Sequence, residues 1–230
     1  IVDTPGHADF GGEVERILSM VDGVVLLVDA AEGPLPQTKF VTGKALKRGL
    51  RPIVLINKCD RPDAEPHKVH DAVFDLFAAL GADDDQLDFP TLFASSKQGW
   101  AAESLEAERK DLAPLFDLIV KHVPAPKAEA RVGEPFQLLS VLIENDPFLG
   151  RLLTGRVEAG IAKPGLAIRA LNREGVEVER GRITKILAFR GLKRQPIETA
   201  EAGDIVAIAG LSKATVADTL CDISLTEALP

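Results

Sequence analysis

The sequence has few cysteines and no long apolar run. Its two cysteines, Cys59 and Cys221, lie far apart and lack the CxxC or His-rich spacing of a metal site. We therefore expect neither a disulfide framework nor a metal centre, and two reduced cysteines are typical of a cytoplasmic protein. No run approaches the roughly 20 apolar residues of a membrane helix, and the chain does not open with a signal-peptide pattern. These features predict a cytoplasmic protein without a membrane partner, and its 46% hydrophobic residues can form a sizeable core.

The sequence also lacks a glycine loop that ends in GK[ST] and cradles phosphates. Residues 42–44 (Thr-Gly-Lys) resemble part of one, but Thr38 stands where its first glycine belongs and Ala45 where Ser or Thr belongs. The segment also falls inside a helix expected after Pro36. Three histidines on predicted helices have no metal-ligand spacing and are expected at the surface: His67, His70 and His122.

Acidic residues outnumber basic ones only in the first half. Residues 1–126 contain 13 Lys/Arg and 21 Asp/Glu, whereas residues 127–230 contain 14 of each. A stretch of the second half carries six basic residues and no acid between them, a composition suited to nucleic-acid phosphates. A solvated strand face or hairpin explains it nearly as well, so both interpretations stay open. The six are Arg180, Arg182, Lys185, Arg190, Lys193 and Arg194.

Strand and helix patterns alternate in the first half. Continuous aliphatic runs at 24–28 and 53–56 predict strands covered on both faces. Residues 91–94 predict a third strand, and Ile1-Val2 the end of a fourth. Apolar residues recur at helical spacing over 69–80 and 112–123, with Gly81 and Pro124 as stop signals. This alternation predicts an α/β domain with a mostly parallel sheet.

A polar residue or cluster follows each of the four predicted strands: Asp3, Asp29, Asn57 and the run Ser95-Ser96-Lys97. Ligands of such sheets bind beyond the carboxyl ends of the strands. We therefore expect these side chains to meet at one edge.

The pattern changes after residue 126. Residues 124–133 are typical of a linker. Short strand candidates follow at 136–143, 152–157, 167–171, 183–188 and 205–208, separated by glycine turns and without a convincing helix. This predicts an antiparallel β-barrel. We therefore divide the chain into a domain at 1–126 and a barrel domain at 127–230.

The segment Asp3-Thr4-Pro5-Gly6-His7 suits the phosphate end of a nucleotide site. A carboxylate at a strand end can hold Mg²⁺ through water. The N–H of a glycine can approach a terminal phosphate oxygen. His7 can orient the water that attacks this phosphate. The alternative is a simple strand-to-loop turn with an incidental histidine, and the five residues alone favour neither interpretation.

The segment Asn57-Lys58-Cys59-Asp60 suits recognition of a guanine base. Asp60 can accept hydrogen bonds from the ring N–H and the exocyclic amine, and Asn57 can contact the other side of the base. The aliphatic stem of Lys58 can lie against the rings, while Ser95 and Ser96 can close over the base. The alternative is a polar turn, but the position directly after a predicted strand favours guanine.

These residues resemble the translational GTPases, the superfamily of elongation factor G, over essentially the whole chain. Residues 3–41 are similar to the segment around their second switch, NKCD to their NKxD motif, and residues 145–160 to the opening strands of their second-domain barrel. Residues 57–66 (NKCDRPDAEP) resemble the NKxDRPDAxP signature of the TypA/BipA subfamily. Residues 202–211 and 218–222 also suit that subfamily.

The resemblance implies a partial P-loop-type GTPase domain followed by a translation-factor β-barrel. It implies that Asp3 belongs to the Mg²⁺ shell, Gly6 to the γ-phosphate switch and His7 to catalysis. The guanine base of GTP or GDP would be bound by five residues: Asn57, Lys58, Asp60, Ser95 and Ser96. The implied activity is hydrolysis of GTP to GDP and phosphate. The implied partners are the ribosome, with its rRNA and proteins, and tRNA through further domains. The implied processes are ribosome assembly and stress or cold adaptation.

The family's phosphate loop and first switch would precede Ile1, and further domains would follow Pro230. We therefore expect this 230-residue chain to bind GTP weakly and to hydrolyse it negligibly. The family's first strand would also be missing from the sheet, so we expect another segment or a neighbouring chain to fill its place, or that end to be distorted. Two rival interpretations are an elongation factor G-like translocase and a non-catalytic module that binds ribosomes or rRNA.

Overall fold

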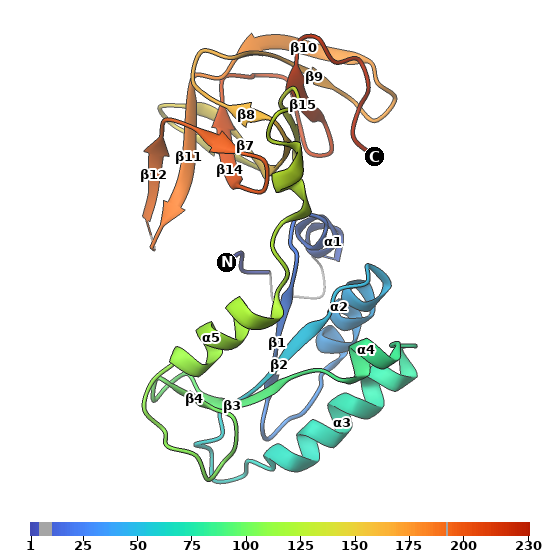
Figure 1. Cartoon of the computed structure of the whole chain (residues 1–230), viewed down its shortest axis with the longest axis vertical. Helices are drawn as coiled ribbons and strands as arrows, with labels where there is room; N and C mark the ends of the chain where they lie inside the picture. Colours follow the sequence, from blue (N-terminus) through green and yellow to red (C-terminus); the bar gives the residue numbers. More distant parts are fainter. Residues whose placement is uncertain (5–10, 192) are drawn as a thin grey trace. The chain divides into compact units, whose positions relative to one another are not determined.

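The computed structural model describes residues 1–4, 11–191 and 193–230 (Figure 1). The predicted site residues Gly6 and His7 lie outside this part. The chain divides into two compact units, Ile1–Ala125 and Pro126–Pro230. Within the described residues, no helix is both long and apolar enough to cross a membrane.

A four-stranded sheet of order β1-β2-β3-β4 forms the centre of the first unit. Strands β1 (Val24–Asp29), β2 (Pro52–Asn57) and β3 (Thr91–Ser95) are parallel, as predicted, and the short β4 (Trp100–Ala102) runs antiparallel to β3. Residues 52–56 of β2 are all buried, because this strand lies inside the sheet and has cover on both faces. The parallel register sets Asp29 beside Asn57.

Among the described residues, five helices accompany this sheet (Figure 1): α1 (Gly11–Ser19), α2 (Pro36–Lys47), α3 (Pro66–Ala79), α4 (Asp84–Leu87) and α5 (Ala113–His122). Three of them, α2, α3 and α5, carry proline in the first turn, where its missing N–H costs nothing. The predicted apolar face of α3 buries Val69, Val73 and Phe77. On α5, Leu115 and Leu118 pack against the sheet, whereas Phe116 is half-exposed.

The expected strand at Ile1-Val2 is not formed. Residues 1–4 have no regular secondary structure and pair with no described strand. A strand of this length forms only when a neighbour supplies hydrogen bonds for its backbone. The described sheet ends at β1, and no described segment occupies the place beyond it. Leu27 of β1 is 56% exposed.

The second unit is an antiparallel β structure preceded by a short 3₁₀ helix, η2 (Lys127–Arg131). Its main sheet has the order β10-β9-β15-β5-β7-β14-β11-β12, with β6 also paired to β7, and β8 and β13 form a separate pair. Its strands are β5 (Gln137–Leu139), β6 (Leu142–Asp146), β7 (Gly150–Ala159), β8 (Ile161–Ala162), β9 (Ala167–Leu171), β10 (Glu177–Arg182), β11 (Lys185–Arg190), β12 (Lys193–Ile197), β13 (Ala200–Glu201), β14 (Ile205–Ala209) and β15 (Thr219–Asp222).

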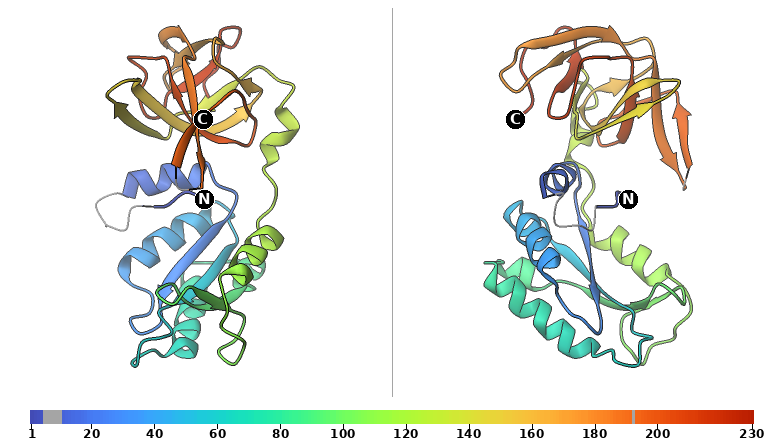
Figure 2. Two further views of the ribbon diagram at one scale, coloured as in Figure 1. Left: turned by 90° about the vertical axis from the view of Figure 1, so that its left-hand side faces the viewer. Right: turned by 180° about the vertical axis from the view of Figure 1, so that it is seen from behind.

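The sheet of the second unit curves but does not close into the predicted barrel (Figure 2). Strands β10 and β12 remain its two ends, each paired on one side only among the described strands. The predicted strand at 136–143 is divided into β5 and β6 because the backbone changes partner: Ser140 N–H donates to Asp218 O, but Val141 N–H donates to Thr154 O. At this point a Cβ on Gly155 would collide with the carbonyl oxygen of Leu139, so only glycine fits.

Candidate functional site

The candidate site lies at the carboxyl ends of the three parallel strands, where Asp29, Asn57 and Ser95 are the last residues of β1, β2 and β3 (Figure 1). Parallel pairing brings these ends to one edge of the sheet. The loops that follow are joined by backbone hydrogen bonds: Ala30 N–H donates to Asn57 O at 2.8 Å, and Cys59 N–H to Ala94 O at 3.0 Å.

Asn57 connects the loop after β2 to the loop after β3. Its side-chain oxygen Oδ1 accepts hydrogen bonds from Ser96 N–H at 2.9 Å and from Ser96 Oγ–H at 3.1 Å. Both contacts involve residues predicted for the site. Asn57 and Ser96 are 39 residues apart in the sequence, and the pairing of β2 with β3 brings them together.

Ser95, the other predicted serine, affects the ionisation of Asp60. A hydrogen bond from Ser95 lowers the pKa of the Asp60 carboxyl below its usual value, and the charge of Lys97 adds to this effect. Ser95 is fully buried, and its hydroxyl oxygen accepts a hydrogen bond from Gln98 N–H at 3.2 Å. Asp60 is therefore ionised at neutral pH and can act as a hydrogen-bond acceptor.

Lys58 has an unusual backbone conformation and a fixed side chain. Its φ is +64°, a left-handed conformation that is uncommon outside glycine. Its ammonium nitrogen Nζ lies 2.7 Å from Asp29 Oδ2, and this hydrogen bond raises the pKa of Lys58. The other oxygen of Asp29 accepts from Ala31 N–H at 2.8 Å. Burial alone would raise the pKa of Asp29, but the hydrogen bonds from Lys58 and the loop N–H groups lower it to about 2.

Arg61 completes this ion-pair network. Its guanidinium donates twice to Asp63, at 2.9 and 2.8 Å, and one nitrogen lies 3.4 Å from Asp29 Oδ2. The same nitrogen lies 3.5 Å from Glu32 Oε1. Sequence reasoning placed Asp29 at the sheet edge but assigned no role to it or to Arg61. The usable signal was an acidic residue at the end of one predicted strand, with Asn57 and Lys58 at the end of the next predicted strand.

The phosphate end of the predicted site is only partly described. Asp3 is exposed, and no hydrogen bond or ion pair joins it to the 57–60 loop in the described structure. Its predicted neighbours Gly6 and His7 lie outside the described residues. No group of three or more His, Cys, Asp or Glu side chains suited to a metal ion occurs among the residues described.

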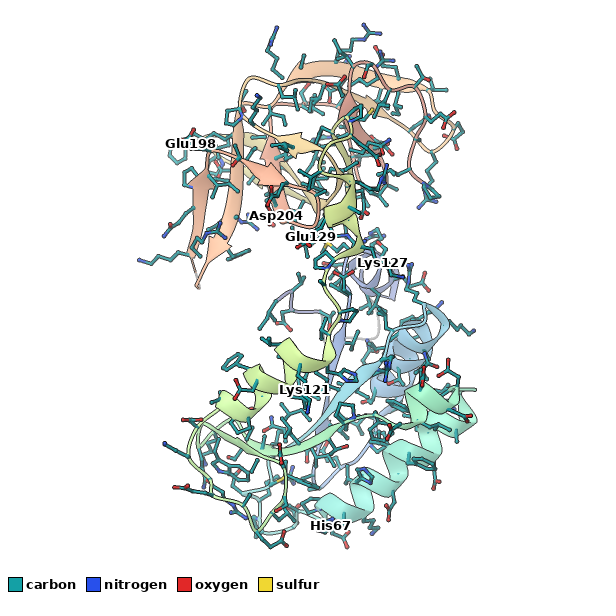
Figure 3. All side chains as sticks on the ribbon, viewed as in Figure 1. His67, Lys121, Lys127, Glu129, Glu198 and Asp204 are labelled. Carbon is teal, nitrogen blue, oxygen red and sulfur yellow. The ribbon has the colours of Figure 1, made fainter. Side chains whose placement is uncertain are left out.

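Residues 42–44 and the histidines, which were not predicted for the site, lie in ordinary structural surroundings. Thr42 is buried within α2, and Lys44 forms an ion pair with Glu15. His67, labelled in Figure 3, lies near the start of α3, and its ring packs against Phe93 with 5.6 Å between ring centres. Both cysteines are free thiols, as expected.

Two family matches cover most of the chain. Residues 1–125 match the family described as elongation factor Tu GTP binding domain, and residues 150–221 match elongation factor Tu domain 2. The chain belongs to the elongation factor Tu GTP-binding domain family.

Within this family the chain is similar to proteins called large ribosomal subunit assembly factor BipA. It is 52% identical to those of Synechocystis sp. and Haemophilus influenzae and 49% identical to that of Escherichia coli, in each case over all 230 residues. These similarities confirm the predicted TypA/BipA subfamily. The chain spans 38% of the Synechocystis relative and 37% of the other two.

The acid-free basic stretch lies in the part that matches elongation factor Tu domain 2. Several of its members have partners: Arg180 pairs with Glu177, and Arg194 donates to both oxygens of Glu144 at 2.8 and 2.9 Å. At the end of the β11–β12 hairpin, Arg190 and Lys193 are register partners and both exposed. Neither forms an ion pair with an acid among the described residues. Two cations opposite each other destabilise a strand pair unless an anion approaches them.

Proposed function

We propose that the first unit binds the base of a guanine nucleotide through Asn57, Lys58 and Asp60, with Ser95 and Ser96 closing the site. The observation that carries this proposal is that Asn57 Oδ1 accepts hydrogen bonds from both the N–H and the hydroxyl of Ser96, which joins the NKCD loop to the serine loop at a single sheet edge. The groups fit guanine chemically. An ionised carboxylate suits its ring N–H and exocyclic amine, and an amide can serve the opposite edge.

For the phosphate end we propose Asp3 as a Mg²⁺ ligand through water, Gly6 as the γ-phosphate contact and His7 as the residue that orients the hydrolytic water. The DTPGH motif and the family match over residues 1–125 support these roles. Asp3 supplies a single carboxylate, which suits Mg²⁺ because this ion keeps several waters and takes phosphate oxygens as ligands. Bound nucleotide and Mg²⁺ would supply the phosphate group and the charge that neutralises it.

GTP hydrolysis to GDP and phosphate is the reaction we propose for the whole protein. The name of its relatives supports a role in assembly of the large ribosomal subunit, with rRNA and ribosomal proteins as partners. Stress adaptation, contact with tRNA and a cytoplasmic location belong to the same proposal.

The base site is tested by nucleotide titration of the 230-residue chain, followed by NMR. We expect GDP to bind with a Kd well above micromolar and to shift resonances of residues 57–60 and 95–97, while ADP leaves them unchanged. Asp60→Asn should weaken GDP and favour XDP, because the amide matches the extra carbonyl of xanthine. Equal binding of GDP and ADP would refute guanine recognition.

A second candidate function, binding of RNA by the second unit, is favoured by the exposed pair Arg190 and Lys193. Phe189 on the same hairpin is 59% exposed and offers a face for base stacking. We expect Arg190→Glu/Lys193→Glu to weaken binding to ribosomal subunits and to reduce the salt slope by about one to two. Reversal of Lys163 and Arg173, two exposed cations elsewhere in this unit, is the matched control. Equal losses in both variants would mean that the hairpin is not a specific contact.

A further inference from the structure

The side chain of Lys58 is fixed at both ends. At the backbone end, the left-handed φ of +64° sets the direction in which the side chain leaves the loop. At the other end, the ammonium is held 2.7 Å from Asp29 Oδ2. A free lysine has four rotatable side-chain bonds, so holding both ends removes most of its conformational freedom before any ligand binds.

The two anchors belong to neighbouring strands. Lys58 directly follows β2, and Asp29 ends β1 as the register partner of Asn57. The aliphatic stem of Lys58 therefore passes along the sheet edge from one strand to the next. The side chain is 55% exposed, so a stem held at both ends can offer apolar surface to a ligand at this edge.

We infer that Asp29 is a positioning residue for nucleotide recognition: it holds the ammonium of Lys58 so that the lysine stem forms one wall of the base site. This inference rests on the proposed guanine function. It separates two tasks within that site. Asp60 and Asn57 select the base by its edge, whereas the Asp29–Lys58 pair provides a flat apolar surface that any purine can use.

The side-chain chemistry allows Asp29 to be tested without dismantling its loop. An asparagine can keep the oxygen that accepts from Ala31 N–H and place its NH₂ toward Lys58 in place of the carboxylate oxygen. Arg61 would stay in place through its two hydrogen bonds to Asp63. Asp29→Asn therefore acts mainly on the ammonium of Lys58.

The experiment measures Kd for GDP and for IDP, which lacks the exocyclic amine, with the 230-residue chain. We expect Asp29→Asn to raise both values by about three- to fivefold, the scale of one partly exposed ion pair, and to leave their ratio unchanged. Glu65→Gln is the matched control, because it removes an exposed carboxylate whose ion-pair partner within the described structure is Lys68. Its Kd values should equal those of the unmodified chain.

A double-mutant cycle with Lys58→Met tests whether Asp29 acts through the lysine. Methionine keeps an apolar stem but has no ammonium to anchor, so adding Asp29→Asn should then change neither Kd. Additive losses, or a changed GDP/IDP ratio, would show that Asp29 shapes the loop instead and would overturn the inference. Unchanged binding by Asp29→Asn would overturn it while leaving the proposed function intact. Failure of the unmodified chain to bind GDP would remove both.

Discussion

Lys58 and Arg61, at the sheet edge of the first unit, end in contact with carboxylates, whereas Arg190 and Lys193 extend from a hairpin of the second unit without such a partner among the described residues. In the first unit, Asp29 is 11% exposed and receives hydrogen bonds from two side chains and two backbone N–H groups. In the second unit, the two cations are opposite each other and exposed. Both arrangements use basic residues, but only the first fixes their positions.

The difference corresponds to the ligands proposed for the two regions. A planar base is selected by groups held at fixed distances, because misplaced donors and acceptors lose their hydrogen bonds. A phosphate backbone attracts any nearby cation and tolerates variable geometry. Paired charges therefore suit the base site, and unpaired charges suit the contact with RNA.

The largest effects should come from substitutions that destabilise the hydrophobic core of one unit at a time. Phe77→Ala removes a fully buried ring from the first unit, and Ile186→Ala removes a fully buried side chain from the second. Each should lower the free energy of unfolding of its own unit by about 2–5 kcal/mol. We expect Phe77→Ala to abolish GDP binding but keep binding to ribosomal subunits, and Ile186→Ala to do the reverse.

Circular dichroism with thermal unfolding, alongside both binding assays, measures this separation. A single variant that loses both functions would show that the two units depend on each other. The fixed charges of the first unit and the free charges of the second could then no longer be compared as properties of independent units.

The sequence predicted the parts of the fold that have an aliphatic signal. The runs at 53–56 and 24–28 became β2 and β1 because continuous burial needs continuous apolar residues. Strands β10 (EVERGR) and β12 (KRQPI) were missed, since their charged residues face solvent at the two ends of the sheet. Pro196 is tolerated in β12 because, of the strands that the structure describes, β12 pairs with β11 alone.

The site was predictable to a similar extent. NKCD and the two serines follow apolar runs, so their common edge could be expected. The contact between Asp29 and Lys58 could not, because it depends on β1 pairing with β2 and on the left-handed backbone of Lys58. No local pattern in the sequence encodes either of these.

The fixed charges should also make the stability of the first unit fall at low pH. The expected change in the free energy of unfolding is smaller than that of the core substitutions. The pKa of Asp29 is about 2 in the folded protein and near 3.8 without its partners. Since the folded pKa is the lower one, the stabilisation is complete above about pH 4 and is lost as the pH falls through about 2. We expect Asp29→Asn to cost about 1–2 kcal/mol at neutral pH, allowing for solvent screening.

Urea unfolding of both proteins between pH 2 and pH 7 measures this difference. The two curves should converge near pH 2. A constant difference across the whole range would show that the Asp29 charge is not its source.

The smallest effect concerns Arg194, the basic residue of the hairpin that does have a carboxylate partner. It donates to both oxygens of Glu144, which lowers the pKa of that carboxyl, and its guanidinium lies 5.1 Å from the centre of the Phe189 ring. Glu144→Gln should cost about 0.2–1 kcal/mol of stability, as for other partly exposed pairs. The released guanidinium would join Arg190 and Lys193 as a third free cation, so binding to ribosomal subunits should tighten and its salt slope should rise by about one. Weaker binding after this substitution would show that the hairpin also needs fixed charges, and the contrast with the proposed guanine site would then fail.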